Sequence, residues 1–186
     1  MKSKIILVTV FLLIGFVILL SCFIATKNII LEVLTITVGV TLYHFAMRLT
    51  VAIIVNLIMK NQADHTNIWF REKGFEKKLY KRLRVRKWKN HLPTFRPERF
   101  DTNRRTVKEI IGATCQAEVV HEIIMIFSLL PIALIPYLGG GVALIITSAL
   151  SMLIDLLFVI LQRYNRPKLI RIMARFPELK GLNKSL

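Results

Sequence analysis

Three titratable side chains, Glu118, His121 and Glu122, stand at the start of a long apolar run. A histidine with a carboxylate three residues before it can accept a proton from a hydroxyl, while the carboxylate orients the imidazole and stabilises the imidazolium. Ionisable groups at membrane depth are costly unless they face a protein interior or a water-filled cavity, so they indicate a functional site. The pattern predicts His121 as a general base oriented by Glu118, with Glu122 as a substrate contact.

Two other apolar segments carry polar residues at helical spacing. His44 and Arg48 share a face in one segment, and Ser151 and Asp155 share a face in the other. Acyl transfer to an alcohol needs a base and a group that stabilises the oxyanion, which makes His44 and Arg48 further catalytic candidates. We expect these residues to join Glu118 in one active site. The alternative is that Arg48 only pairs with Asp155 and that the serine assists helix packing.

The same side chains raise the possibility of metal chemistry. Glu118-x-x-His121 is half of the motif found in di-iron bundles, which need a second copy and further glutamates on facing helices. The sequence has no second copy, and it also lacks His-Glu-x-x-His, a phosphate-binding glycine loop and Gly-x-Ser-x-Gly. We therefore predict no metal and no cofactor. A metal-dependent lipid-modifying enzyme that uses Glu118, His121 and Glu122 remains the weaker alternative.

The elements that must position these residues are membrane helices. The chain has 186 residues, of which 54% are hydrophobic, a share above that of ordinary soluble domains. About 20 apolar residues cross the hydrocarbon core of a bilayer. Four such spans are predicted, at residues 5–26, 29–59, 117–138 and 142–161. The expected fold class is all-α, a polytopic membrane bundle of four transmembrane helices that forms one domain over residues 1–186.

The distribution of charge predicts the topology of this bundle. The net charge is +16, and residues 60–110 hold sixteen Lys or Arg against six acidic residues. Residues 163–186 hold seven against one, whereas the connectors on the other side carry almost no charge. By the positive-inside rule, both basic segments and both termini are cytoplasmic. We therefore expect a multi-pass protein of the bacterial plasma membrane.

The basic segment over residues 68–89 has the pattern of an amphipathic helix. Phe75, Leu79 and Leu83 recur every four residues, and cations fill the opposite face. Such a helix lies in the headgroup region of a bilayer, where each cation contributes about 1 kcal/mol to binding of anionic lipid. Charge alone does not indicate nucleic-acid binding, and no recognition motif is present, so no nucleic-acid partner is expected.

Three strings in the sequence resemble one enzyme family. They are RKWK at residues 86–89, Glu118-x-x-His121, and QRYNRP at residues 162–167. In order and approximate spacing, the chain from about residue 40 to residue 175 resembles the glycosyl-4,4'-diaponeurosporenoate acyltransferases, which are small bacterial membrane enzymes.

This resemblance implies transfer of a fatty acyl group to a hydroxyl, which belongs to the sugar of a lipid glycoside in the typical member. By position, Glu118 and His121 would be the acid–histidine pair of the family. An extra first span and the additional candidates His44 and Arg48 depart from the typical member, so the acceptor is not assumed to be a carotenoid glycoside.

We therefore predict an integral-membrane acyltransferase that works at the cytoplasmic leaflet. Its partners would be an acyl donor (acyl-CoA, acyl-carrier protein or phospholipid), a lipid or glycolipid acceptor, and anionic membrane lipids. Arg48 or Arg163 would stabilise developing negative charge, and cations would hold the donor phosphates. A non-enzymatic protein that binds anionic lipid or acts as a scaffold is the alternative. The predicted substrate contacts are Arg86, Lys87, Trp88, Lys89, Glu122, Asp155, Arg163, Asn165 and Arg166.

Overall fold

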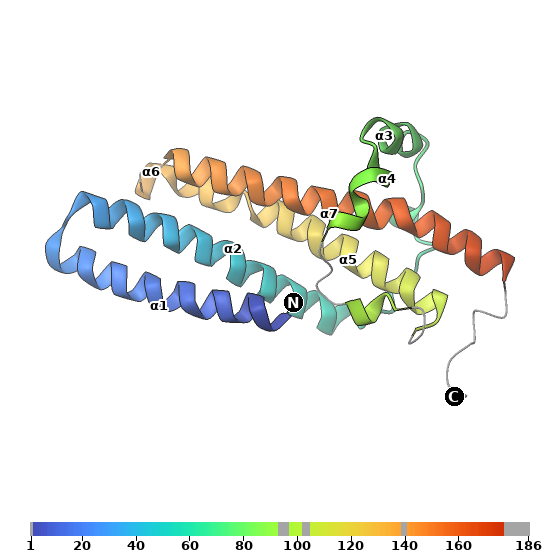
Figure 1. The fold of residues 1–186 in the computed structure, drawn as a ribbon, viewed down its shortest axis with the longest axis horizontal. Coiled ribbons are helices and arrows are strands. Elements are labelled where there is room, and N and C mark those ends of the chain that lie inside the picture. Colours follow the sequence, from blue (N-terminus) through green and yellow to red (C-terminus); the bar gives the residue numbers. More distant parts are fainter. Residues whose placement is uncertain (1, 93–96, 102–104, 139–140, 177–186) are drawn as a thin grey trace. The chain divides into compact units, whose positions relative to one another are not determined.

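The computed structural model describes residues 2–92, 97–101, 105–138 and 141–176 (Figure 1). Parts of the predicted cytoplasmic segment 60–110 and of the predicted tail 163–186 lie outside these ranges. Within the described residues the regular structure is helical and contains no strand. Four helices are long and apolar enough to cross a membrane, and they confirm the predicted class of all-α membrane bundle.

The elements are numbered in chain order, and η marks a 3-10 helix (Figure 1). They are α1 (Lys2–Thr26), α2 (Ile29–Met59), η1 (Ile68–Phe70), α3 (Glu76–Arg82), α4 (Val85–Trp88), η2 (Lys89–His91), η3 (Pro97–Arg99), α5 (Val107–Phe127), η4 (Leu130–Leu134), α6 (Ile135–Leu138) and α7 (Gly141–Arg175). The chain forms two compact units, and α2, α5 and α7 contribute residues to both. The first unit comprises residues 1–53 and 123–155, and the second comprises residues 54–122 and 156 onward.

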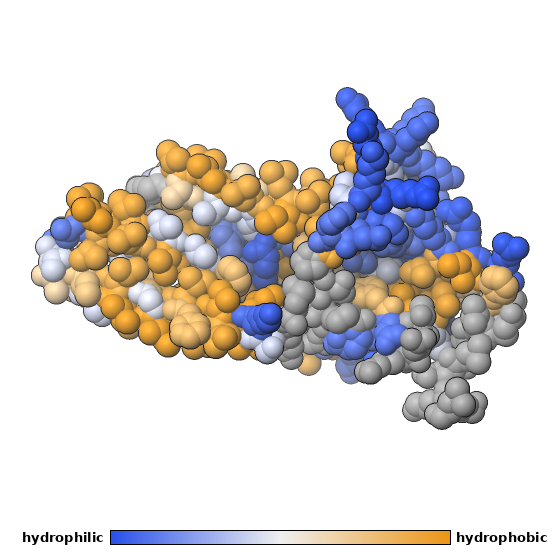
Figure 2. Space-filling model, in the orientation of Figure 1, coloured by the Kyte–Doolittle hydropathy of each residue, from blue (hydrophilic) through white to orange (hydrophobic). Residues whose placement is uncertain are grey.

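In the first unit, α1 and α2 form an antiparallel hairpin whose turn is set by two residues. Lys27 has a φ of 51°, and the Asn28 side chain accepts a hydrogen bond of 2.8 Å from the backbone of Ile30 at the start of α2. On α2, a Cβ atom at Gly39 would lie 2.8 Å from the ring of Phe16, so glycine permits the close approach of α1. Hydrophobic residues cover the outer surface of these two helices (Figure 2).

In the second unit, α5 begins with a capping box. Glu109 donates its backbone N–H to the Thr106 hydroxyl at 3.2 Å, and the Glu109 carboxylate accepts the N–H of Thr106 at 2.9 Å. A Cβ at Gly112 on this helix would lie 2.8 Å from the carbonyl oxygen of Asn61, so the loop after α2 packs directly on the α5 backbone. The core of this unit includes the fully buried Val85 and Ile111.

The bounds of the third and fourth helices differ from the predicted spans. The third helix starts at Val107, where the sequence predicts a short helix from about residue 106 that leads into the span 117–138, and it gives way after Phe127 to η4 and α6. Pro131 lies in η4 and Pro136 in α6, and a proline disrupts an α-helix by removing a backbone donor. The fourth helix continues past residue 161 to Arg175.

The segment 68–89 forms several short helices instead of one continuous amphipathic helix. It contains η1, α3 and α4, separated by Gly74 and by Arg84, whose φ of 50° lies in the left-handed region. Of the predicted apolar stripe, Phe75 and Leu83 are exposed and Leu79 is half-buried, whereas Tyr80 and Val85 are buried. The break at Arg84 changes the direction of the chain, so α3 and α4 cannot present a single straight face.

Candidate functional site

A buried ion-pair network links α5 and α7 in the second unit. Glu118 is 0% exposed and Arg166 is 1% exposed. The Arg166 guanidinium donates to Glu118, to the Thr114 hydroxyl at 3.2 Å and to the carbonyl of Phe70 at 3.0 Å. Arg163 donates to the other carboxylate oxygen of Glu118 at 2.5 Å. Two guanidinium groups therefore compensate the charge of one buried carboxylate.

A second carboxylate, Glu76, extends the network to α3. Arg163 donates its Nε–H to Glu76 at 2.9 Å, and the Tyr80 hydroxyl donates to the other Glu76 oxygen at 2.7 Å. Glu76 is 3% exposed, so the network contains two buried acids, the buried Arg166 and the partly exposed Arg163. Burial and the hydrogen bond to the Glu76 carboxylate raise the pKa of Tyr80 well above its ordinary value. Tyr80 is therefore protonated and donates to Glu76 at every physiological pH.

The same arginine holds the backbone of the segment before α3. The Arg163 guanidinium contacts the carbonyls of Trp69 and Arg71 at 3.3 Å each. The Trp69 indole N–H donates to the Glu122 carboxylate of α5 at 3.0 Å. The segment from η1 to α3 is thus fixed to α5 and α7 by charge-assisted hydrogen bonds. Glu122, predicted as a substrate contact, is half-buried and already accepts a hydrogen bond from the protein.

His121 lies one helical turn after Glu118 on α5 and is half-buried. Its imidazole stacks on the ring of Phe158 from α7, with the ring centroids 4.6 Å apart and the planes 9° from parallel. Stacking over an apolar ring fixes the plane of the imidazole and limits its rotation. The helix α5 therefore carries an oriented imidazole one turn after Glu118, and the role of this imidazole as a base oriented by Glu118 stays a prediction.

The geometry gives no support to the metal-dependent alternative. Among the described residues, no group of three or more His, Cys, Asp and Glu side chains is arranged to hold a metal ion. The carboxylate oxygens of Glu118 instead contact Arg163 and Arg166, two cationic partners that oppose the approach of a further cation.

A cavity of about 570 Å³ lies between α3, α4 and α7 in the second unit. Its lining includes seven cationic side chains and one acidic side chain, Glu72. Hydrophilic residues dominate the surface over α3 and α4 (Figure 2). The size falls within the range of small-molecule sites, and the charge suits a ligand with several phosphate oxygens. The lining residues are Glu72, Lys77, Tyr80, Lys81, Arg84, Arg86, Lys87, Tyr164, Pro167, Lys168 and Arg171.

The predicted substrate contacts of the basic strings have different surroundings. Arg86 and Lys87 line the cavity, and the ammonium of Lys89 lies 5.8 Å from the ring centroid of Tyr164 at its wall. The Trp88 indole N–H donates to the carbonyl of Leu83 at 3.0 Å, so this side chain fixes the turn before α4.

Two predicted contacts on α7, Asn165 and Arg166, differ in their burial. Asn165 is half-buried and lies between Arg163 and Arg166 in the sequence. Arg166 was predicted to hold a donor phosphate, but its guanidinium is buried among Glu118, Thr114 and Phe70. Its position makes it a structural partner of Glu118, and its contact with a donor phosphate stays a prediction.

The first unit contains a separate polar group. Arg48 donates to Asp155 at 2.5 Å and to the Ser151 hydroxyl at 2.8 Å, and Ser151 shares a hydrogen bond of 2.8 Å with Ser128. His44 is 5% exposed, and neither of its ring nitrogens has a hydrogen-bond partner among the described residues. The structure therefore pairs Arg48 with Asp155. A single active site that also includes Glu118 remains a prediction, because Glu118 belongs to the second unit.

Comparison with known families identifies the family of the chain. The profile of the glycosyl-4,4'-diaponeurosporenoate acyltransferase family matches residues 66–175, which is more than half of the sequence. The chain belongs to this family. It is therefore an enzyme of the acyltransferase class, which favours catalysis over the non-enzymatic alternative. Comparisons with curated proteins and with solved structures gave no significant match.

The segment matched by this acyltransferase family contains the buried network and the cationic cavity, but it excludes His44 and Arg48. Sequence reasoning missed Glu76, which stands in a run of cations and reads as an ordinary solvated residue. The available signal was its spacing of four from Tyr80, which places both side chains on one helical face. The cavity residues Lys168 and Arg171 were also missed, because α7 was expected to end before them.

Proposed function

We propose that this acyltransferase moves a fatty acyl group from a phosphate-bearing donor to a hydroxyl of a lipid or glycolipid acceptor at the cytoplasmic leaflet. The family assignment supplies the reaction class. The observation that carries the assignment of roles is the stacked imidazole of His121, one turn from the buried carboxylate of Glu118 and on the helix that Arg163 contacts.

In the proposed reaction, His121 accepts the proton of the acceptor hydroxyl as the oxygen attacks the acyl carbonyl carbon. The new ester bond forms, and the bond between the acyl carbon and the leaving oxygen or sulfur of the donor breaks. The imidazolium then returns its proton to that leaving group, so the catalyst is regenerated. Nothing beyond the donor and the acceptor is consumed.

The surrounding charges have distinct roles in this mechanism. Glu118 orients the His121 imidazole and stabilises the imidazolium; each carboxylate oxygen has two lone pairs, so contacts with the arginines leave capacity for another donor. Arg163 is the nearer candidate for stabilising the oxyanion, because it reaches the Glu118 carboxylate from α7 and keeps part of its side chain exposed. Arg48 pairs with Asp155 and is assigned to holding the helices of the first unit.

Two other histidines are weaker candidates for the base. The family match contains His91 and His121, whereas His44 lies outside it. His91 is exposed in η2, where water would surround the imidazole and no apolar wall would orient it. His44 is buried in the first unit, and within the part of the chain that the structure describes no hydrogen-bonded partner orients its ring.

The cationic cavity is proposed as the site of the donor phosphates. Arg86 and Lys87 reach it from α4, and Lys168 and Arg171 reach it from α7. Guanidinium and ammonium groups match phosphate oxygens in acyl-CoA, in the prosthetic group of acyl-carrier protein and in phospholipids. We further propose that this cationic surface faces the cytoplasm of a bacterial cell, with both termini on the same side, because the cations concentrate in the segments that follow α2 and end α7.

The proposed function is tested by acyl transfer with the purified protein in proteoliposomes. Labelled acyl-CoA, acyl-carrier protein and phospholipid donors are offered in turn with extracted lipid as acceptor, and the products are identified by mass spectrometry. The expected product is a lipid ester whose formation depends on one of these donors. If every donor leaves the lipid fraction without a new ester while the protein is folded, the proposal is wrong.

Removing two charges from the cavity is expected to weaken donor binding. In an Arg86→Gln/Lys87→Gln variant, KM for the donor should rise about 10-fold with a small change in kcat, since these contacts stabilise the bound donor and the transition state equally. The effect should shrink at high salt, which screens exposed charges. The matched control is Lys78→Gln/Arg82→Gln, which removes the same two charge types from exposed positions of α3 outside the cavity lining. Equal KM changes in both variants would show that the cavity does not bind the donor.

A further inference from the structure

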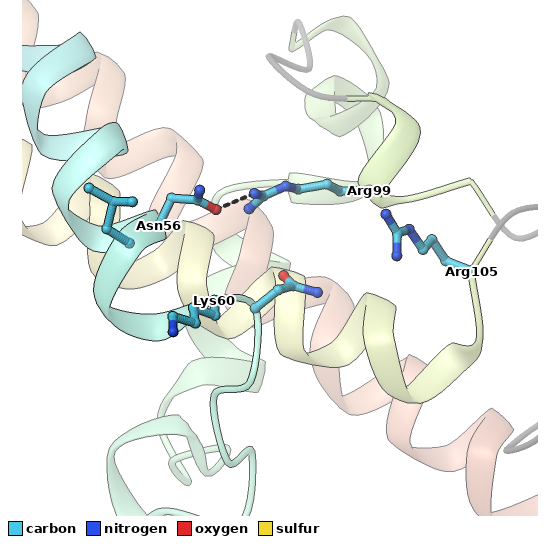
Figure 3. Close-up of a pocket in the computed structure, with 6 residues that line it drawn as sticks. Asn56, Lys60, Arg99 and Arg105 are labelled. Atoms are coloured by element: carbon cyan, nitrogen blue, oxygen red, sulfur yellow. Dashed lines mark hydrogen bonds between the residues drawn. The ribbon is translucent and has the colours of Figure 1, made fainter.

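A second cavity, of about 370 Å³, lies where α2 ends, beside η3 and the start of α5. It is lined by Asn56, Leu57, Lys60, Asn61, Arg99 and Arg105. This set contains three cationic side chains and no acidic one, and none of these residues lines the cationic cavity between α3, α4 and α7. Figure 3 shows Arg99 extending to Asn56 while Arg105 approaches from the segment that precedes α5.

Hydrogen bonds fix three of the lining residues, Asn56, Asn61 and Arg99. Arg99 donates to the side-chain oxygen of Asn56, which also accepts from the Gln116 amide at 3.3 Å. The Gln116 oxygen accepts the backbone N–H of Asn61 at 2.6 Å, and the Asn61 amide donates to the carbonyl of Glu109 at 3.1 Å. The end of α2 is therefore tied to α5, and the pocket is built before any ligand enters.

Two features of the lining identify the chemistry of a ligand. Lys60 and Arg105 supply positive charge, and the Glu109 carboxylate compensates Arg105 only partly, at 3.3 Å between exposed groups. The side-chain oxygen of Asn61 is buried and has no hydrogen-bond partner within the described part of the chain. A buried acceptor without a partner is costly. The pocket thus fits a ligand that carries both an anionic group and a hydroxyl donor.

The position of the pocket at the end of an apolar helix favours a lipid ligand. Leu57 lines the pocket and is 65% exposed, and the neighbouring Ile54 and Ile58 on the same span are also exposed. An apolar helix surface that leads into a cationic pocket at the end of a membrane span matches a phospholipid, with its acyl chain on the helix and its phosphate at the hydrocarbon boundary.

We propose that this pocket binds an anionic phospholipid with a hydroxylated headgroup, of the phosphatidylglycerol type. Lys60 and Arg105 contact the phosphate, and a headgroup hydroxyl donates to Asn61. The bound lipid links the end of α2 to the start of α5. This proposal rests on the second cavity and does not depend on the acyl-transfer mechanism.

The test is titration of the full-length protein in detergent with phosphatidylglycerol, followed by native mass spectrometry and thermal unfolding. Phosphatidylglycerol should bind and raise Tm, whereas phosphatidylcholine with the same acyl chains should bind at least about 10-fold more weakly. Phosphatidylmethanol carries the same charge without the headgroup hydroxyls, and it should fall between the two. Inorganic phosphate should leave Tm unchanged at concentrations at which phosphatidylglycerol saturates the protein.

The variant Lys60→Gln/Arg105→Gln should weaken phosphatidylglycerol binding by about 10-fold or more, while Lys78→Gln/Arg82→Gln, with the same loss of charge, should bind as the wild type does. If the double variant is unstable, the single Lys60→Gln and Arg105→Gln variants should each show a weaker but measurable loss. Equal binding of phosphatidylglycerol by the variant and its control would overturn the proposal, because it would show only nonspecific attraction between the anionic lipid and the basic surface. A rise in Tm with inorganic phosphate as large as that with lipid would overturn the lipid assignment.

Discussion

Replacing His121 with alanine is expected to lower the turnover of acyl transfer by about 10²- to 10⁴-fold, since that is the usual contribution of a positioned general base. The imidazole lies against Phe158, so the substitution also removes a stacking contact. His121→Gln separates the two effects, because glutamine fills part of the space and forms hydrogen bonds but does not titrate. Both variants should lose kcat, with little change in KM for the donor. The measurement is steady-state turnover in proteoliposomes.

His91→Ala is the matched control for this prediction. It removes the other histidine within the family match from an exposed position in η2, and it should retain wild-type turnover. Turnover in His121→Gln equal to that of the wild type would show that another group takes the proton. In that event the buried His44 of the first unit becomes the next residue to test.

Replacing Glu118 with alanine is expected to destabilise the fold by about 3–5 kcal/mol, because it leaves Arg166 buried and short of its compensating charge. That loss is a large part of the 5–15 kcal/mol that stabilises a typical domain. Glu118→Gln retains acceptor capacity and should lose less. The double variant Glu118→Leu/Arg166→Met removes both charges and should recover part of the loss, since apolar replacement of a buried pair is often tolerated.

The measurement is thermal or denaturant unfolding in a fixed detergent or nanodisc. Lys77→Ala provides the comparison: its ammonium lies 3.9 Å from Glu72 with 75% of the side chain exposed, so its removal should change stability by less than about 1 kcal/mol. A Glu118→Ala protein that unfolds at the wild-type Tm would contradict the buried network. A Glu118→Gln protein that is stable but inactive would assign this carboxylate a role in catalysis as well.

The membrane class and the position of Glu118 and His121 one turn apart on one helix could be predicted from the sequence, because both depend on local composition and spacing. The C-terminal limit of α7 could not. Hydropathy declines where charged residues begin, yet Arg163 and Arg166 lie inside α7, where contacts with other elements bury Arg166 and leave Arg163 only partly exposed. The start of α5 is determined by the capping box of Thr106 and Glu109, two polar residues outside the apolar run.

The buried network shows a second limit of sequence patterns. Glu118 was recognised as costly in an apolar segment, but its partners lie 45 and 48 residues away on α7. Spacing identifies groups on one helix face, whereas pairing between helices depends on tertiary packing. The buried Glu76 illustrates the same point: its neighbours in sequence are cations, and only the fold shows that it faces Arg163.

The most direct test of the proposed function is the lipid profile of a strain that lacks this enzyme, compared with strains complemented by the wild type or by His121→Gln. The proposal predicts that one acylated lipid disappears in the deletion strain while its hydroxylated precursor accumulates. The wild type should restore the acylated lipid, and an equally abundant His121→Gln protein should not. Restoration by His121→Gln would contradict the role of His121, and an unchanged lipid profile in the deletion strain would contradict acyl transfer to a membrane lipid.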